Sequence, residues 1–361
     1  AATGAALLIG VTLVSTIATG AASAKETMNG ALATRYSVDI VAMGDDISQQ
    51  MAKDVADING VSDTLYAPAV SVTLEKADGT QPTSALLVGV KNIDQVKQVM
   101  RANLGNASID SDSVLMPTYN AQTGKELQFA NGTADFSTEW NQDGVTTRSL
   151  TLQANQADYR RVSAQYGAVG FVDESHFTNG DLDAATHVLL VKADTDKSGV
   201  SVDGIYNDMQ AALEKSADAT VTGPIAERIV WANMIDSMMM LLVGLIAVAV
   251  LIALVGVANT LSLSVIERTR ESATLRAIGM TRGQLRRSLA VEALLISLVS
   301  GIAGVLLGTL FGWLGAYVVF SMYGKVVFPF EWGINGIVLA VAAVAALLAS
   351  VFPARRAVST P

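Results

Sequence analysis

A short arginine-rich segment, residues 267–285, lies between two hydrophobic runs, each long enough to cross a membrane. The basic residues in it and just after it outnumber its two glutamates, Glu267 and Glu271; they are Arg268, Arg270, Arg276, Arg282, Arg286 and Arg287. Enrichment of arginine and lysine in a short loop between spans marks the cytoplasmic side. This segment therefore predicts the topology of the whole chain, with its own loop inside the cell.

The same segment carries signals for a tight turn between two helices. Gly279 can adopt the left-handed backbone that ends a helix. Thr281 and Gln284 have the spacing of a capping box, which predicts that the next helix begins there. Apolar residues cluster at the bend, namely Leu275, Ala277, Ile278 and Met280. Two interpretations remain open: a membrane loop whose arginines bind lipid phosphate, or a projection that docks into a groove on a cytoplasmic partner.

The segment resembles the signature of FtsX-like permeases of the MacB type, which are subunits of ABC transporters. The matching residues are Glu267, Arg268, Thr269, Arg270, Glu271, Leu275, Arg276, Ala277, Ile278, Gly279, Gln284 and Leu285. The order of the hydrophobic runs and the C-terminal Pro353-Ala354-Arg355-Arg356 extend the resemblance over essentially the whole chain. Ser272 departs from it, because the family usually carries a bulkier apolar residue there.

The resemblance implies that this loop is a coupling helix seated on a separate ABC ATPase. ATP and Mg²⁺ are then expected on that partner, and no cofactor is expected on this chain. The coupling residues implied are Glu267, Arg268, Arg270, Glu271, Leu275, Arg276, Ala277, Ile278, Gly279 and Met280.

Composition and charge agree with a membrane protein that exports a large domain. Apolar residues make up 51% of the 361 residues, and the mean hydropathy is +0.40. Residues 25–233 contain 15 Lys/Arg and 28 Asp/Glu, a net charge of −13, so the rest of the chain sums to +4 against the overall −9. An acidic body between basic flanks fits the positive-inside rule and argues against a nucleic-acid partner. The absence of cysteine excludes disulfides and thiolate chemistry.

Four membrane spans are expected. Residues 3–24 form the first, within a segment 1–35 that includes an outer extension. A signal peptide is the alternative, because Ala22-Ser23-Ala24 resembles a cleavage site, but no basic leader precedes it. Residues 224–266 are expected to form one helix, stalk plus second span, of about 43 residues and roughly 65 Å. The cytoplasmic coupling segment 267–285 follows, and then the third span at 286–320 and the fourth at 333–352.

Residues 36–223 are expected to form an extracytoplasmic α+β domain. Hydrophobic periodicity predicts two βαβ-like units. The first has strands at 38–42 and 61–66 around a helix, and the second has strands at 186–191 and 220–222 around a helix at 202–213. A β-rich insertion, about 71–183, separates them, with strands expected at 84–90, 127–130 and 148–152, a helix at 93–104 and a turn at Asn131-Gly132.

No catalytic constellation is recognisable in the sequence. No GxSxG, HExxH or glycine-rich phosphate loop occurs. Asp173-Glu174-Ser175-His176 is the nearest approach to a metal site, but a solvated acidic turn is favoured because no second ligand stands at the usual spacing. We therefore predict a protein that is not an enzyme, with no catalytic and no metal-binding residues.

The third span carries a strip of small residues at every fourth position. Ser300, Gly304, Gly308 and Gly312, with Ala316 beyond them, predict close approach of another helix, either within the subunit or from a second one. Glu292, near the cytoplasmic start of this span, is either a functional ionisable group or a side chain that reaches the basic loop.

These features predict the permease subunit of an ABC complex in a bacterial plasma membrane. ATP hydrolysis by the partner would move the coupling segment and the long helix, and would reshape the outer domain. Partners expected are the ATPase, membrane lipid, and a second copy or second half of the permease. The resemblance implies lipoproteins, peptides, antibiotics or cell-wall hydrolases as clients. The alternative is a membrane-anchored sensor or scaffold that binds a ligand outside and recruits a signalling protein inside.

Overall fold

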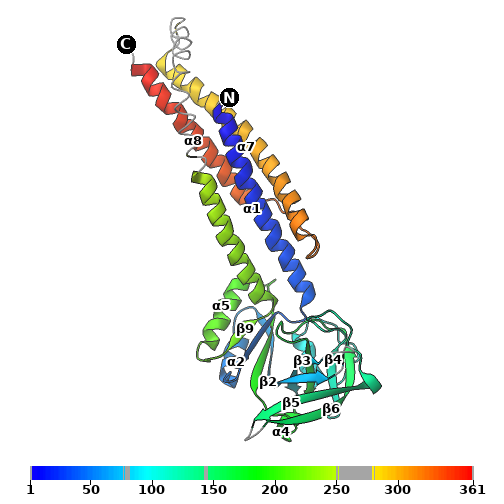
Figure 1. Cartoon of the computed structure of the whole chain (residues 1–361). Helices are drawn as coiled ribbons and strands as arrows, with labels where there is room; N and C mark the ends of the chain where they lie inside the picture. The colour runs from blue at the N-terminus through cyan, green and yellow to red at the C-terminus, as the bar shows by residue number, and fades with distance from the viewer. Residues whose placement is uncertain are drawn as a thin grey trace. The chain divides into compact units, whose positions relative to one another are not determined.

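The computed structural model describes residues 2–75, 77, 82–141, 145–248, 251, 279 and 281–359. The chain divides into two compact units, which are described separately (Figure 1). Ala1–Gly30 and Trp231–Pro361 form a helical unit, and Ala31–Val230 form an α+β unit.

The helical unit is built from long apolar helices. They are α1 (Ala2–Arg35), the helix Pro224–Val248, α7 (Arg282–Phe320) and α8 (Trp332–Ser359). Three described stretches are long and apolar enough to cross a membrane, namely Gly4–Arg35, Pro224–Val248 and Arg287–Phe320, and Trp332–Leu348 is a shorter apolar helix. The ends of α1 and of the helix Pro224–Val248 belong to the α+β unit, so both helices pass from one unit to the other.

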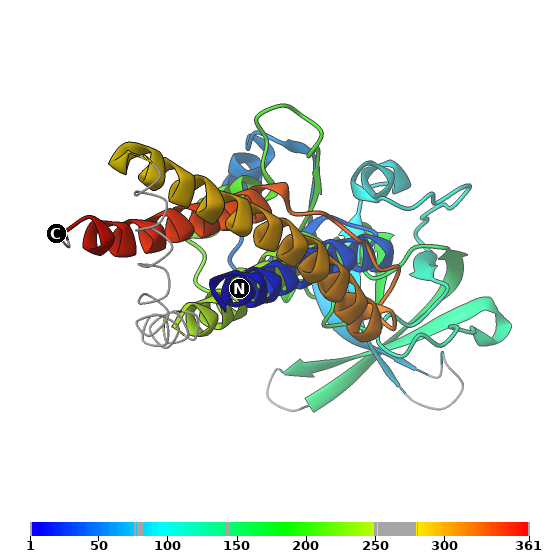
Figure 2. The same cartoon turned by 90° about the horizontal axis from the view of Figure 1, so that it is seen from above.

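Three of these helices, α1, α7 and α8, pack side by side within the helical unit (Figure 2). Their shared core consists of Leu7, Val11, Val305, Ala342 and Ala346. Most other large apolar residues of α7 and α8 are exposed, for example Val299, Val318 and Ile337. Apolar side chains that face outward around a packed core are expected of helices surrounded by lipid.

The α+β unit is organised around one sheet of nine strands in the order β3-β7-β4-β6-β5-β2-β8-β1-β9. The strands are β1 (Ile40–Gly44), β2 (Val61–Glu75), β3 (Thr83–Val90), β4 (Ser113–Pro117), β5 (Thr133–Asn141), β6 (Val145–Ala157), β7 (Ala168–Asp173), β8 (Thr186–Ala193) and β9 (Thr220–Thr222). The helices are α2 (Gln49–Ala56), α3 (Ile93–Val99), α4 (Ser175–Thr178), α5 (Val202–Leu213) and the 3₁₀ turn η1 (Ala130–Gly132).

Two β-α-β segments, β1-α2-β2 and β8-α5-β9, interleave at one end of this sheet. β8 lies antiparallel between β1 and β2, and β1 lies antiparallel between β8 and β9. Each segment therefore places a strand of the other between its own two strands, which is the split-βαβ arrangement. Ser48 and Ser201 cap α2 and α5 by accepting hydrogen bonds from backbone N–H groups.

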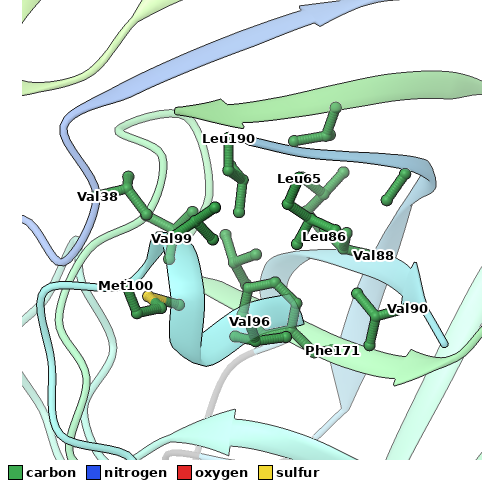
Figure 3. Close-up of a cluster of buried hydrophobic side chains, with 14 of the residues drawn as sticks. Val38, Leu65, Leu86, Val88, Val90, Val96, Val99, Met100, Phe171 and Leu190 are labelled. Carbon is green, nitrogen blue, oxygen red and sulfur yellow. The ribbon is translucent and has the colours of Figure 1, made fainter. Parts of the chain in front are cut away.

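The alternation of side chains along β1 and β8 decides which helices cover which face. Ile40 and Leu189 pack with residues of α2 and α5, whereas Val41 and Leu190 pack with α3 on the opposite face. Successive residues of a strand point to opposite faces, so one short strand serves both cores. Figure 3 shows the second of these cores, where Val96 and Val99 of α3 meet Leu65, Leu86 and Leu190 of the sheet.

The β-rich insertion differs from the prediction at one strand and adds three, β4, β5 and β7. Residues 127–129 have no regular secondary structure and lead into η1, so the strand predicted at 127–130 is wrong. The predicted turn is confirmed: Asn131 and Gly132 have φ of 57° and 71°, which ends the preceding segment and lets β5 begin at Thr133. β4 and β7 were not predicted. Nearly all their residues are buried, so they lack the alternation that reveals a half-buried strand.

Tyr159 joins β4 and β7 from inside the core. Its hydroxyl lies 3.1 Å from the carbonyl oxygen of Leu115 and 2.5 Å from that of Val169. We expect Tyr159→Phe to lower the free energy of unfolding by about 1–3 kcal/mol, because two buried carbonyl groups lose a donor. Tyr119→Phe is the control, since Tyr119 is 54% exposed and should have almost no effect. Thermal unfolding of the two variants side by side checks this, and equal midpoints would contradict it.

Candidate functional site

The predicted coupling residues lie almost entirely outside the described residues. This applies to Glu267, Arg268, Arg270, Glu271, Leu275, Arg276, Ala277, Ile278 and Met280. Gly279 is described, and its φ of 100° confirms the left-handed backbone. The capping box is also confirmed: the Gln284 N–H donates to the Thr281 hydroxyl at 3.3 Å, and the Thr281 N–H donates to the Gln284 side-chain oxygen at 3.0 Å. The turn that ends the segment is thus fixed by local chemistry.

The small-residue strip of α7 lies against α1 of the same chain. A Cβ atom added at Gly304 would lie 2.8 Å from a Val11 methyl, and one at Gly308 would lie 2.5 Å from Cβ of Ser15. Gly312 has the same relation to Thr19, at 2.7 Å. These separations leave no room for any side chain. Ser300 continues the strip, since a Cβ at Gly4 of α1 would lie 3.2 Å from its hydroxyl.

A row of hydroxyl side chains on α1, which the sequence reasoning missed, faces the other helices of the bundle. Ser15, Thr19, Ser23 and Thr27 recur at every fourth position, and none exposes more than 1% of its surface. Ser15 donates to the side-chain oxygen of Asn335 at the start of α8, at 2.9 Å. Hydroxyls at helical spacing in an apolar span are the signal that could have revealed this row.

The C-terminal end of this row bonds to the connection between α7 and α8. The Ser23 hydroxyl donates to the carbonyl oxygen of Val327, and the Thr27 hydroxyl accepts from the Val327 N–H at 3.1 Å. Both backbone polar groups of Val327 are therefore bonded to α1. Nearby, the indole N–H of Trp313 donates to the carbonyl oxygen of Pro329 at 2.8 Å. The connection 321–331 is thus fastened to two helices of the helical unit.

Glu292 lies on an exposed face of α7, five residues after Arg287. The structure therefore places it outside the packed contact between α1 and α7.

Within the α+β unit, the residue that follows α1 contacts the start of the helix Pro224–Val248. Tyr36 directly follows α1, and its hydroxyl donates to the carboxylate of Glu227 in the first turns of the helix Pro224–Val248. Burial raises the pKa of Tyr36 to about 12, and the bond to Glu227 adds to the rise. The guanidinium of Arg161 lies over the Tyr36 ring, 5.5 Å from its centroid. Tyr36 thus remains a neutral donor at any physiological pH.

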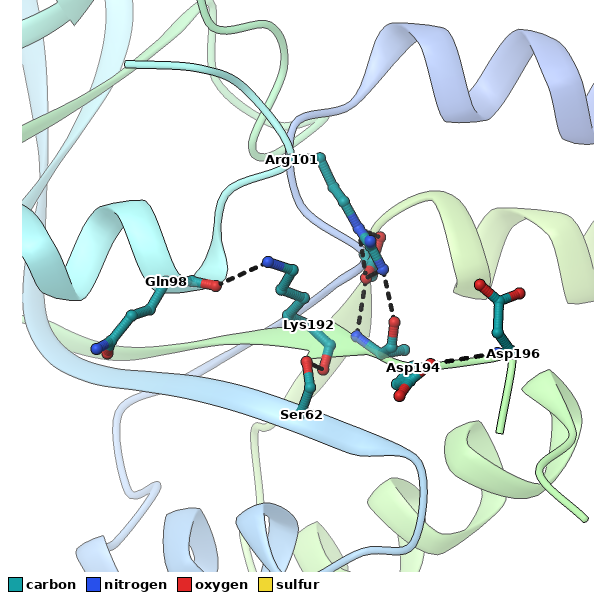
Figure 4. Close-up of polar contacts among 8 residues, drawn as sticks. Ser62, Gln98, Arg101, Lys192, Asp194 and Asp196 are labelled. Atoms are coloured by element: carbon teal, nitrogen blue, oxygen red, sulfur yellow. Dashed lines mark hydrogen bonds and ion pairs between the residues drawn. The ribbon is translucent and has the colours of Figure 1, made fainter. Parts of the chain in front are cut away.

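Asp39 is the hub of this junction. Its carboxylate accepts from the Arg101 guanidinium, at 3.1 Å from Nε and 2.7 Å from Nη2, and from the N–H of Ala193 at 2.8 Å. Its backbone carbonyl accepts from the N–H of Ile225 at 3.3 Å. Figure 4 shows Arg101 beside the end of β8. The hydrogen bonds with Asp39 also raise the pKa of Arg101. One residue therefore connects the end of α3, the end of β8 and the start of the helix Pro224–Val248.

Gly223 allows that helix to begin so close to β1. Its φ is 103°, and an added Cβ would lie 3.1 Å from the carbonyl oxygen of Asp39 and 3.2 Å from Cα of Ile40. Only glycine meets both conditions at low cost.

The prediction of a solvated turn is wrong for His176, which is buried. The residue is 5% exposed. Its Nδ1 lies 2.9 Å from a carboxylate oxygen of Asp181, and its Nε2 lies 2.7 Å from the carbonyl oxygen of Ser111. The contact with His176 lowers the pKa of Asp181. Among the described residues, no group of three or more His, Asp or Glu side chains is arranged to hold a metal ion.

Comparison with known proteins finds a family model that matches the C-terminal third. Residues 243–361 match the model of the FtsX-like permease C-terminal region. A macrolide export ATP-binding/permease protein MacB of Brucella abortus (strain 2308) is 32% identical over 141 residues, which cover 37% of this chain and 22% of that protein. The uncharacterized ABC transporter permease MJ1507 of Methanocaldococcus jannaschii is 29% identical over 121 residues, 32% of this chain and 30% of that one. The chain thus spans less than a third of the length of either relative.

Two further similarities extend beyond the C-terminal third. A pyoverdine export ATP-binding/permease protein PvdT of Pseudomonas aeruginosa is 23% identical over 261 residues, which cover 63% of this chain and 39% of that protein. The crystal structure of the periplasmic region of MacB from Actinobacillus actinomycetemcomitans aligns with 55% of this chain and 95% of that one, at 11% identity and a TM-score of 0.31.

The contact between α1 and α7 can be tested with two alanines. Gly308→Ala should lower the thermal midpoint of the detergent-solubilised protein, because its Cβ would lie 2.6 Å from the Thr12 carbonyl and 2.5 Å from Ser15. Overpacking of this kind costs about 1–3 kcal/mol. Gly315→Ala is the matched control on the same helix, since nothing lies within 4 Å of its Cβ position. A fall of equal size in both variants would show that the strip does not pack as described.

The Asp39 hub can be tested by removing one charge. Asp39→Asn should lower the free energy of unfolding of the α+β unit by about 1–3 kcal/mol, because the side chain loses its negative charge and one of the two oxygens that accept from Arg101 and Ala193. Asp57→Asn, at the exposed end of α2, should leave it unchanged. Loss of near-ultraviolet circular dichroism with temperature reports both. No difference between the two variants would refute the role of the hub.

Proposed function

Because the chain carries an FtsX-like permease C-terminal region over residues 243–361, we propose that it is the transmembrane subunit of an ABC transporter complex. The observation that carries this proposal is the position of the match. It includes the arginine-rich segment 267–285 and the hydrophobic runs on both sides of it. The residues proposed to contact the ATPase therefore lie inside the matched region.

Four spans are proposed, with the amino terminus and the coupling segment inside and the α+β unit outside. The described helices supply three stretches of membrane length and one shorter apolar helix. The acidic charge of residues 25–233, −13 net, agrees with export of that unit. A bacterial plasma membrane is the proposed location.

We propose that the protein works by transmitting motion rather than by passing a substrate between its helices. Closure of the ATPase would displace the coupling segment, and the helix Pro224–Val248 would carry the displacement outward. At its outer end this helix meets the Asp39 hub and the Tyr36–Glu227 bond. The Ile225 N–H joins the helix to the backbone of Asp39, and the Asp39 carboxylate in turn bonds to the N–H of Ala193 at the end of β8, so a displaced helix would carry β1 and β8 with it.

On this proposal ATP and Mg²⁺ bind to the partner ATPase, and this chain holds neither. Membrane lipid and a second permease chain or half complete the complex. Two of the relatives named above, MacB and PvdT, are named as exporters of macrolides and of pyoverdine. We propose a client that the α+β unit handles outside the membrane, from the classes of antibiotics, peptides, lipoproteins or cell-wall hydrolases.

The proposal predicts that charge reversal in the coupling segment abolishes stimulation of the ATPase. Arg268→Glu with Arg276→Glu should leave folding and membrane insertion intact, since both residues lie in a short loop outside the spans. An ABC ATPase should copurify with the unaltered protein and be stimulated by it several-fold, and the double variant should lose that stimulation.

Lys325→Glu, in the exposed connection between α7 and α8, is the charge-reversal control and should retain full stimulation. Copurification of a kinase or another regulator in place of an ABC ATPase would contradict the proposal. So would unchanged stimulation by the double variant.

A further inference from the structure

The helix α1 presents two opposite faces to the rest of the helical unit. Ser23 and Thr27 lie on the face that bonds to Val327. Lys25 lies between them in sequence. At about 100° per residue, it points roughly 200° away from Ser23, to the other side of the helix. There its ammonium group pairs with the carboxylate of Asp236 in the helix Pro224–Val248.

The first face of α1 is held by many buried contacts. The glycine strip of α7 allows the two backbones to approach closely, Ser15 bonds to Asn335 of α8, and Ser23 and Thr27 hold both polar groups of Val327. In hydrocarbon or at its edge, separation of such groups leaves them without partners, which is costly. Helices α1, α7 and α8 and the connection 321–331 therefore resist separation.

The second face is held much more weakly. None of the most apolar 18-residue window of Pro224–Val248 is buried by the described residues. Met238, Leu241 and Leu245 are 56%, 71% and 68% exposed. The ion pair is partly hydrated, with Lys25 at 30% and Asp236 at 49% side-chain exposure. Ion pairs this exposed contribute little to stability and exchange readily with water.

The sequence of the helix Pro224–Val248 allows this ion pair in one register only. The other acidic residue of this helix is Glu227, which bonds to Tyr36. A slide of one helical turn, about 5.4 Å, would bring Asn233 or Met240 into the place of Asp236. Neither can neutralise an ammonium group. Lys25 therefore distinguishes one position of the helix from those a turn away.

We propose that α1, α7, α8 and residues 321–331 form one rigid block, and that the helix Pro224–Val248 moves against it with the Lys25–Asp236 pair as a reversible catch for its resting register. This deepens the proposed function by naming the part that moves and the contact that holds it. The block stays together because its contacts are buried, and the helix moves because its described contact is weak and specific.

The chain contains no cysteine, so pairs of spin labels can be introduced without background. One pair, Glu26→Cys with Asn233→Cys, measures α1 against the moving helix. The control pair, Glu26→Cys with Tyr323→Cys, measures α1 against the connection 321–331, which belongs to the same block. Pulsed electron paramagnetic resonance in lipid nanodiscs, with no ATPase and no nucleotide, gives the distribution of each distance.

Asp236→Asn should broaden or shift the first distribution by several ångströms and leave the second unchanged. The swapped pair, Lys25→Asp with Asp236→Lys, should restore the first. Ser23→Ala with Thr27→Val should broaden the second, because Val327 loses both partners. An unchanged first distribution in Asp236→Asn, or equal broadening of both, overturns the proposal.

If Asp236→Asn does not yield monodisperse protein, the variant Lys25→Asp with Asp236→Lys serves as the test. A Glu26–Asn233 distance distribution in that variant that differs from the distribution with Lys25 and Asp236 in place would overturn the proposal. No ATPase enters these measurements. Failure of the proposed function would appear as the absence of a copurifying ABC ATPase, whereas failure of the catch would appear in the distances alone.

Discussion

The close contact between α1 and α7 is the constraint on which the helical unit depends. Between lipid-exposed helices there is little hydrophobic gain, because lipid tails are as apolar as leucine, so association rests on close packing and on polar contacts. The glycines of α7 provide the first, and the hydroxyl row of α1 provides the second. Each needs the other: a side chain at Gly308 would displace Ser15, and Ser15 could then no longer reach Asn335.

The α+β unit depends on a different kind of contact at the junction. Its sheet is stable through burial, with residues of β1 and β8 alternating between two cores. Burial alone does not fix the direction in which a helix leaves the sheet, because the hydrophobic effect is not directional. Asp39 supplies direction through bonds of defined geometry to Arg101, Ala193 and Ile225. Asp39 also lies against Gly223, whose backbone is left-handed. This close contact further restricts how the helix Pro224–Val248 begins.

The sequence predicts the elements of this protein better than their connections. The helix Val202–Leu213 and the strand Thr220–Thr222 have the predicted bounds, because a clear period of 3.6 and flanking turn residues mark them. The capping box at Thr281 was predictable for the same local reason. Strands β4 and β7 were not, because they are buried on both faces and their side chains do not alternate. The partners of Asp39 could not be predicted from local sequence patterns, because Arg101 and Ala193 lie 62 and 154 residues away in sequence.

The contrast between buried and exposed polar contacts also explains how one chain can be rigid in some places and compliant in others. A carboxylate that accepts a bidentate guanidinium and a backbone N–H, as Asp39 does, is held in one geometry. A half-exposed pair such as Lys25–Asp236 exchanges with water at small cost. A helix that is firmly bonded at one end and weakly held along its length can shift along its axis. Its displacement is then passed to the firmly bonded end rather than resisted by contacts along the way. On the proposed function, the distribution of charge and burial would therefore decide where this helix transmits motion and where it is free to slide.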